Sequence, residues 1–364
     1  MILTPTFYIL KGACFRQWEQ QIGNVMGIIL VTSVNAIVPI VLQILLGYIL
    51  KEKGFITKDF IKIGNKLVFN VLLPCMLFIN VYSIDRFSSI NWNIVIYCLI
   101  LMVAIFVLGF GIAAAATKAP ERRGVILQCS FRSNIAIIGL SLASALGGEE
   151  AVAVTAIIST FMIPVNNILA VLSLSVYTDN GASNGARIKG MLLNIVKNPL
   201  IIGVTVGLAA LGIRELQNAV FGEVIFAFNK QTKFLYTAVN NLKAITTPFS
   251  LLVLGAQFEF SAVKGLLKEI VTGTACRVLL APLMGIGFAI LLSEMGILSC
   301  GVNEYPALIA LFGSPVAVSS AVMAASMGAD EQLATQLVVW TSIFSIFTIF
   351  AEVCILMSMG LLAV

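Results

Sequence analysis

Long apolar blocks separated by short polar stretches run along almost the whole chain. Each block extends for roughly 20 residues or more, the length that an α-helix needs to cross the hydrocarbon core of a bilayer. The blocks do not alternate apolar and polar residues, as the strands of a membrane barrel would. The pattern therefore predicts an all-α integral membrane protein, in which each spanning backbone closes its own hydrogen bonds as helix.

Ten blocks are long enough to span a bilayer. The weakest separations are GlyGlyGluGlu at 147–150 and GlyAlaAspGlu at 328–331. Two adjacent carboxylates would be costly at the bilayer centre, so both breaks are predicted to be turns at a membrane face. The predicted spans cover approximately residues 28–50, 66–84, 92–117, 124–146, 151–177, 189–212, 234–256, 262–292, 304–328 and 333–362.

Composition strengthens this fold class and removes several kinds of function. Hydrophobic residues make up 59% of the chain and charged residues 11%, whereas soluble domains carry about 25% charged residues. The net charge of +5 is spread over short loops and forms no stripe, so no nucleic-acid partner is expected. The chain has no histidine, and its seven cysteines show no CxxC spacing. Neither a metal site nor a cofactor is therefore expected.

Lysine and arginine orient the predicted spans. One set of alternate loops carries about twice as many basic residues as the other, which places that set in the cytoplasm. This orientation predicts a multi-pass protein of the cell membrane with both termini outside. Residues 1–25 fit poorly, because their charges follow the short apolar stretch and do not precede it, unlike a signal peptide. They are interpreted as an exterior segment or a mis-assigned start.

A weak internal repeat divides the chain. With a constant shift of 181 positions, Phe-x-Ser at 131–133 aligns with 312–314, and the Gly-x-acid-acid run at 147–150 aligns with 328–331. Spans 4 and 5 therefore repeat as spans 9 and 10. Two units of five spans follow, at 26–180 and 181–364. Because five is odd, the second unit is inverted relative to the first, an arrangement typical of secondary transporters.

Both repeats carry a polar interruption at the same place within an apolar span. Span 4 contains Ser133 and Asn134, and span 9 contains Gly313, Ser314 and Pro315. Proline removes a backbone donor, and Ser and Asn side chains compete with the helical hydrogen bonds. In inverted-repeat transporters the substrate lies near such interruptions, where exposed backbone groups line a cavity. These residues are therefore predicted to form the substrate site.

Arg132 directly precedes the first interruption, inside a predicted span. A lone arginine there costs about 2.5–3.5 kcal/mol on insertion scales, which favours a role in ligand recognition. Its planar guanidinium suits a carboxylate, which it can bind through two parallel hydrogen bonds. The alternative is a structural arginine that reaches the interface or pairs with Glu352 or Glu259.

Other polar residues inside the spans have less specific interpretations. Asn70 and Asn166 are expected to line the substrate cavity, although Asn70 could instead mark a kink. Glu352 is the deepest carboxylate and the candidate for proton or sodium coupling. Arg277 is interpreted as a pairing or interfacial residue. Gly203-x-x-x-Gly207 is typical of close helix packing.

An ordered set of motifs resembles the auxin efflux carrier family from about residue 26 to the end of the chain. The motifs are VNAIVPIVLQILLGYILKEKGFI in span 1, LVFNVLLPCMLF in span 2, FRSNIAIIGLSLASALG in span 4, TTPFSLLVLGAQF in span 7 and FGSPVAVSSAVMA in span 9.

The resemblance implies a ten-helix, inverted-repeat fold of the sodium–bile-acid-symporter type, often a homodimer. Spans 1, 2, 6 and 7 would form a scaffold, and the other six an elevator-type transport domain with the broken helices 4 and 9 crossing. Asn134 and Pro315 fall at the family's crossover positions. Plant auxin carriers have Asn-Pro at the first crossover and often a long central loop, whereas this chain has Asn134-Ile135 and a short loop at 178–188. Arg132 is closer to the bacterial members, which are associated with malate and malonate.

The predicted function is secondary active transport of a small organic anion, a mono- or dicarboxylate, through the lipid bilayer by alternating access. A cation/proton antiporter would need mid-membrane aspartates, and an intramembrane enzyme a nucleophile with its base or metal ligands; the predicted spans have neither. A passive channel of the same fold is the remaining alternative. The predicted substrate-binding residues are Arg132, Ser133, Asn134, Ser314, Pro315, Asn70 and Asn166.

Overall fold

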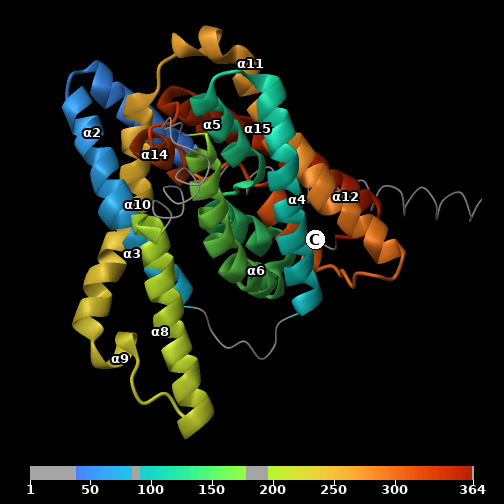
Figure 1. Cartoon of the computed structure of the whole chain (residues 1–364). Helices are drawn as coiled ribbons and strands as arrows, with labels where there is room; N and C mark the ends of the chain where they lie inside the picture. Colours follow the sequence, from blue (N-terminus) through green and yellow to red (C-terminus); the bar gives the residue numbers. More distant parts are fainter. Residues whose placement is uncertain (1–37, 84–90, 178–195, 363–364) are drawn as a thin grey trace, which may run out of the picture.

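The computed structural model describes residues 38–83, 91–177 and 196–362. Within these ranges the chain is built from helices, and its sole extended pairing is one isolated β-bridge (Figure 1). The all-α class predicted from the apolar blocks is confirmed for this part of the chain. The segment 1–25, the central loop at 178–188 and the boundary between the two predicted units lie outside the described residues.

The helices follow one another along the chain with short connections. They are a helix through residues 38–52, α2 (Lys58–Leu67), η1 (Val68–Leu72), α3 (Leu73–Tyr82), α4 (Trp92–Ala116), α5 (Pro120–Phe131), η3 (Ile135–Gly139), α6 (Leu140–Val176), α8 (Pro199–Phe221), α9 (Phe228–Gln231), α10 (Lys233–Gln257), α11 (Ala262–Ala275), η4 (Cys276–Leu280), α12 (Ala281–Glu294), α13 (Glu304–Leu308), η5 (Ile309–Gly313), α14 (Ser319–Ser326) and α15 (Glu331–Ser358). The η elements are single π-helical turns within longer helices.

Among the described residues, six helices are long and apolar enough to cross a membrane. Several of them combine consecutive elements, since α2, η1 and α3 are continuous, as are α11, η4 and α12. The predicted spans 4 and 9 are interrupted, so neither of them forms one continuous helix long enough to cross a membrane. The six are Lys58–Tyr82, Trp92–Ala116, Leu140–Val176, Pro199–Phe221, Ala262–Glu294 and Glu331–Ser358.

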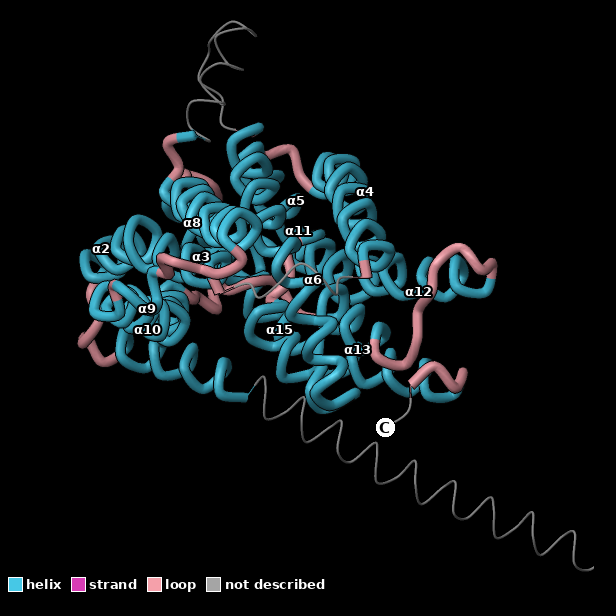
Figure 2. The backbone as a smooth tube through the Cα atoms, turned by 90° about the horizontal axis from the view of Figure 1, so that it is seen from below, coloured by secondary structure: helices cyan, strands magenta, loops and turns pink. Residues whose placement is uncertain are grey.

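The helices form two groups that lie side by side. Figures 1 and 2 show α2, α3, α8, α9 and α10 on one side, and α4, α6, α11, α12 and α15 on the other. The helix through residues 38–52 packs against α10 and belongs to the first group, whereas α5, α13 and α14 pack against helices of the second group and belong to it. The first group unites elements that are far apart in the sequence, because α2 and α3 end at Tyr82 and α8 begins only at Pro199. The cavities described below are lined by residues of both groups.

Small residues bring the helices of the first group together. A Cβ added at Gly203 of α8 would lie 2.7 Å from the carbonyl oxygen of Pro74, and one at Gly207 would lie 2.9 Å from the Cβ of Val81. A side chain at either position would therefore push α8 away from α3. The helix-packing interpretation of the Gly-x-x-x-Gly pair is confirmed.

Both turns predicted at the acidic Gly motifs are present. Gly148 (φ +61°) and its non-helical neighbour Gly147 divide α6 into two helices, and Gly328 (φ +75°) ends the turn after α14. Glycine is suited to these positions because positive φ carries no Cβ penalty. Asp330 then caps α15, because its side chain accepts a 2.8 Å bond from the backbone N–H of Leu333.

An ion-pair cluster joins three elements of the second group. Arg122, near the start of α5, lies 3.0 Å from Glu269 of α11 and 3.0 Å from Asp330, which precedes α15. The backbone N–H of Asp330 also donates to the carbonyl oxygen of Glu121 at 3.3 Å. One arginine with two carboxylates thus fixes the ends of these helices against each other.

Candidate functional site

Two interrupted helices meet inside the second group. Helix α5 ends at Phe131, and Arg132 continues in an extended conformation (φ −78°, ψ 111°). Turn η5 ends at Gly313, and Ser314 is likewise extended. An antiparallel bridge joins Ser133 to Val316, and the backbone N–H of Asn134 donates to the carbonyl oxygen of Pro315 at 2.9 Å. The two breaks predicted from the sequence are therefore present and in contact; we call this place the crossover.

Arg277, in η4, satisfies the backbone groups that the breaks leave without partners. The last carbonyls of a helix find no donor within that helix. The fully buried Arg277 guanidinium donates to four such oxygens at 2.8–3.0 Å, which suits its five fixed donors. The acceptors are the carbonyl oxygens of Phe131, Leu311, Phe312 and Ser314.

Arg132 is also buried, with 3% of its surface exposed, but its partners are side chains. Its Nη2 donates to Oδ1 of Asn167 at 2.9 Å and to Oγ of Ser319 at 2.8 Å. Its Nη1 contacts the sulfur of Met323. All three partners are neutral. The guanidinium is thus oriented by hydrogen bonds while its charge is left uncompensated.

The structure excludes the expected alternative partners of Arg132. Within the described residues, no carboxylate lies within 4.0 Å of its guanidinium. Glu259 instead lies 3.5 Å from Lys51, on another helix. A buried charge without a counter-charge is costly, so a bound anion would contribute favourably at this position.

A narrow pocket of about 70 Å³ opens beside the guanidinium of Arg132. We call it the crossover pocket. Residues of the crossover and of α6 form one wall, and α3 and α10 of the first helix group form the other. Its polar lining comprises Asn80, Arg132, Ser133, Asn134, Asn166, Asn167, Thr246, Thr247, Ser250 and Ser319.

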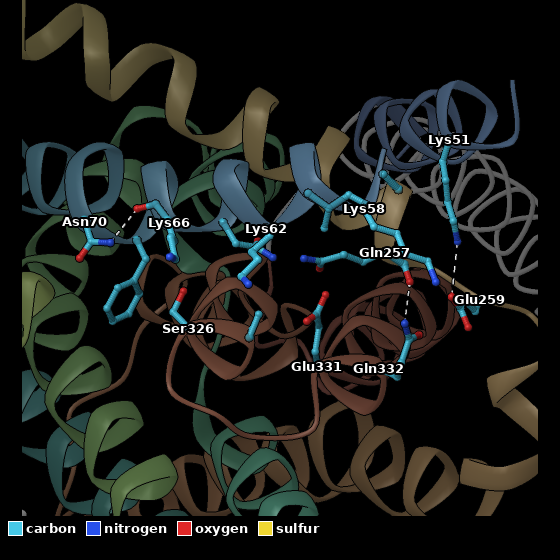
Figure 3. A pocket seen from close by; sticks show the side chains of 15 residues that line it. Lys51, Lys58, Lys62, Lys66, Asn70, Gln257, Glu259, Ser326, Glu331 and Gln332 are labelled. Atoms are coloured by element: carbon cyan, nitrogen blue, oxygen red, sulfur yellow. Dashed lines mark hydrogen bonds and ion pairs between the residues drawn. The ribbon is translucent and has the colours of Figure 1, made fainter. Parts of the chain in front are cut away.

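Larger cavities lie at either end of the continuous helix Lys58–Tyr82. One, of about 400 Å³, shares Met76, Asn80, Ile163 and Thr247 with the crossover pocket and reaches Lys243; we call it the Lys243 cavity. The other, of about 790 Å³, is lined by four lysines of the first helix group; we call it the lysine cavity (Figure 3). All three cavities separate the same two helix groups.

The three cavities lie between two groups of apolar helices, one of which contains the crossover. Residues 32–351 match the membrane transport protein family. The chain belongs to this family. It is the family of the auxin efflux carriers, which the ordered motifs predicted.

Two archaeal relatives of this membrane transport protein are known only as uncharacterized transporters. One, from Methanocaldococcus jannaschii, is 24% identical over 63% of this chain and 70% of its own length. The other, from Methanothermobacter thermautotrophicus, is 20% identical over 87% of this chain and 96% of its own length. The relatives support a transporter and name no substrate.

The structure brings four of the predicted binding residues of this transporter together. Arg132, Ser133, Asn134 and Asn166 all line the crossover pocket. Asn167, which follows Asn166 after Pro164 in α6, makes the direct bond to Arg132. The sequence contained this Asn-Asn pair, but the helix register that points Asn167 at the guanidinium depends on the packing of α6.

The remaining predicted residues lie elsewhere. Ser314 and Pro315 supply backbone groups at the crossover and do not line the pocket. Asn70 lines the lysine cavity, where its Nδ2 donates to the carbonyl oxygen of Lys66 at 2.8 Å. Asn70 thus belongs to the same continuous helix as one wall of the crossover pocket but lies outside that pocket.

Glu352 of α15 lies behind the crossover. Its two carboxylate oxygens are buried and have no hydrogen-bond partner within the described residues. A Cβ added at Gly313 would collide with one of them, which places the carboxylate directly against the end of η5. Gly313 lies between Phe312 and Ser314, whose carbonyl oxygens both accept bonds from Arg277, so the carboxylate lies near this guanidinium. The arrangement gives the crossover one fixed cation and one adjacent acid.

Proposed function

We propose that this transporter carries a small organic anion, a mono- or dicarboxylate such as malate or malonate, by alternating access across the cytoplasmic membrane. The observation that carries the proposal is the guanidinium of Arg132, which is buried in the crossover pocket and bonded to neutral groups. A carboxylate would neutralise this charge and accept parallel hydrogen bonds from it.

The surroundings of Arg132 are suited to a ligand with polar oxygens. Asn134 and Asn166 provide amide groups, and Thr246 and Ser250 of α10 provide hydroxyls on the facing wall. One wall belongs to each helix group. A substrate held between them would lose half of its contacts whenever the groups separate, which is suited to release.

The ten-span, inverted-repeat arrangement belongs to the same proposal. The first helix group would be the scaffold, in a homodimer, and the second an elevator-type transport domain that carries the crossover. In support, the two interruptions fall at positions related by the 181-residue shift, Phe131/Phe312 and Ser133/Ser314, and are in contact.

Coupling to a proton through Glu352 is part of the proposal. A buried carboxylate without hydrogen-bond partners is costly when ionised, so a proton would bind there readily. Sodium is the less favoured ion, because the carbonyl oxygens at the crossover already accept bonds from Arg277. A protonated Glu352 would also change the field at Arg277 and thereby at both helix ends.

The direct test is counterflow of radiolabelled malonate and malate in proteoliposomes, with wild type and Arg132→Ala side by side. Wild type is expected to show substrate-dependent counterflow, which a passive channel would not. Arg132→Ala is expected to lose at least about tenfold in kcat/KM, because it removes a charge-assisted bidentate contact. Arg132→Lys keeps the positive charge but cannot form two parallel hydrogen bonds to a carboxylate, so its loss in kcat/KM is expected to lie between those of wild type and Arg132→Ala.

Arg123→Ala is the matched control. Arg123 lies in α5, the helix that ends just before Arg132. Its side chain donates to the carbonyl oxygen of Thr117 at 2.9 Å and lines none of the three cavities. It is expected to transport like wild type. Equal transport by wild type and Arg132→Ala would refute the role of Arg132, and absence of carboxylate counterflow in wild type would refute the substrate class.

A further inference from the structure

The lysine cavity contains a regular row of basic side chains. Lys58, Lys62 and Lys66 recur at every fourth residue of α2, so they lie on one helix face. All three line the cavity, and Figure 3 shows them along one wall, facing Glu331 and Gln332 of α15. The row therefore belongs to the cavity and is more than a general excess of basic residues in the loops.

The charge of the cavity is positive. Four lysines line it against two glutamates, and one lysine, Lys51, is paired with Glu259 at 3.5 Å. In the described part of the chain, Lys58, Lys62 and Lys66 have no carboxylate within 4.0 Å. A concave surface with an excess of one sign of charge raises the local concentration of ions of the opposite sign.

The same helix face continues from the lysine row to the crossover pocket. Asn70, one turn beyond Lys66, continues the row along the lysine cavity (Figure 3). Leu73 and Leu77 then line the crossover pocket, and Asn80 lines both that pocket and the Lys243 cavity. One face of the continuous helix Lys58–Tyr82 thus borders all three cavities in turn.

We propose that the lysine cavity is a second, low-affinity binding site for the transported carboxylate, which collects the anion before it reaches Arg132. This inference rests on the proposed function and adds a site to it. The positive charges of Lys58, Lys62 and Lys66 attract the anion. The amide of Asn70 follows the last lysine on the way to the crossover pocket. Because these lysines are exposed, the anion stays hydrated and exchanges rapidly, and the site weakens with added salt.

A free carboxylate is favoured over a lipid headgroup by the far wall of the cavity. The side opposite the lysines carries the polar groups of Ser326, Glu331 and Gln332, and the amide of Gln332 donates to the carbonyl oxygen of Gln257 at 3.0 Å. The single carboxylate of Glu331 leaves the three lysines of the row in excess. A lipid would need an apolar opening for its chains, whereas these groups suit a small hydrated anion.

A cysteine at position 326 can measure the anion concentration in the cavity independently of transport. Ser326 lines the cavity and is exposed, so Ser326→Cys should react with methanethiosulfonates. The rates of a sulfonated and a trimethylammonium reagent are compared in purified protein at low salt, with mass spectrometry reporting on residue 326. The anionic reagent is expected to be favoured about tenfold, and malonate is expected to slow it.

The reaction rates of the cysteine at position 326 are then compared between two triple variants, each made in the Ser326→Cys protein. Lys58→Gln/Lys62→Gln/Lys66→Gln removes the row and is expected to abolish both the anion preference and the malonate protection. The control, Lys53→Gln/Lys118→Gln/Lys264→Gln, changes the net charge equally at exposed lysines that line none of the three cavities, and is expected to preserve both. Equal effects of the two triples would overturn the inference, as would protection by phosphatidylglycerol in place of malonate.

Transport kinetics distinguish this inference from the proposed function. At low ionic strength, the row triple is expected to raise the KM for malonate by at least about threefold at unchanged kcat, and high salt should remove the difference from wild type. An unchanged KM in the row triple, with transport still lost in Arg132→Ala, would overturn the collecting site alone. If wild type carries no carboxylate, the labelling rates of the Ser326→Cys protein still decide whether the cavity binds anions.

Discussion

Two arginines are buried in the second helix group, and their neighbours differ in kind. Arg277 donates to four backbone carbonyls that would otherwise have no partner, so every donor it uses serves the fold. Arg132 is bonded to the side chains of Asn167 and Ser319 beside a pocket. The first arrangement is typical of a structural residue, and the second leaves a buried charge without a counter-charge, which is the basis of the proposed substrate site.

Replacement of Arg277 by leucine is expected to destabilise the protein strongly. Each buried carbonyl left without a partner costs about 1–3 kcal/mol, and this variant would leave four. Thermal unfolding in detergent measures the effect. Arg277→Leu should lower Tm clearly more than Arg132→Ala does. A similar small shift in both variants would contradict the structural role of Arg277.

Replacement of Glu352 by glutamine is expected to separate coupling from translocation. The variant keeps the shape of the side chain and cannot take up or release a proton. Malonate uptake driven by an imposed pH gradient should fall to the level seen without a gradient, while counterflow at equal pH should remain. Glu223→Gln is the control, because Glu223 is exposed and lines none of the three cavities, and it should preserve gradient-driven uptake. Unchanged uptake in Glu352→Gln would exclude this residue from coupling.

Sequence alone identified Arg132 as a candidate but not the role of Arg277. A lone arginine next to Ser133 and Asn134 is conspicuous in an apolar span, because its burial is costly there. The partners of Arg277 are helix-end carbonyls from two separate breaks, and they become visible only when both breaks are placed side by side. Asn70 was expected at the substrate site, but it lines the lysine cavity. The sequence does not show where along a helix one cavity ends and the next begins.

At the scale of helices, glycine permits the closest contacts in the first group. A Cβ added at Gly255 of α10 would overlap the carbonyl oxygen of Ile44, and one at Gly47 would overlap that of Leu252. The helix through residues 38–52 and α10 therefore touch backbone to backbone. Close approach of this kind is a main source of helix association in membranes, where lipid removes the hydrophobic drive.

Gly255→Leu is expected to force these two helices apart. Overpacking of a tight contact typically costs about 1–3 kcal/mol, so Tm should fall by several degrees. Gly212→Leu is the matched control, because a Cβ added at Gly212 of α8 meets nothing within 4 Å. Its Tm should stay unchanged or rise slightly, since leucine is the better helix former. Equal losses in both variants would argue against a specific contact at Gly255.

The helix breaks were predictable because each leaves a local sequence signal. Pro315 cannot donate to a helix, and the acidic glycine motifs cannot lie at the bilayer centre. Their conformational detail was not predictable. The 181-residue shift pairs Gly147 with Gly328, yet positive φ occurs at Gly148 and Gly328, so the two turns reverse the chain with a one-residue offset. Matching residues thus mark the same kind of turn without the same backbone angles.

For the molecule as a whole, the position of the cavities is informative. The lysine cavity, the crossover pocket and the Lys243 cavity all lie where the two helix groups face each other. The pocket at the crossover is much smaller than the cavities on either side, about 70 Å³ against 790 and 400 Å³. Movement of one group along the other would open this constriction to one cavity at a time, which is the basis of the alternating-access proposal.

Distances between spin labels can test whether the two groups move as separate bodies. Exposed positions allow three pairs in a variant without native cysteines: Phe221 with Phe234 inside the first group, Trp92 with Phe347 inside the second, and Phe221 with Trp92 across the groups. Malonate under turnover conditions should shift or broaden the distance distribution of the third pair only, because the first two pairs each lie within one packed group. A change within either group, or an unchanged distribution for all three pairs, would contradict rigid-body movement of the second group against the first.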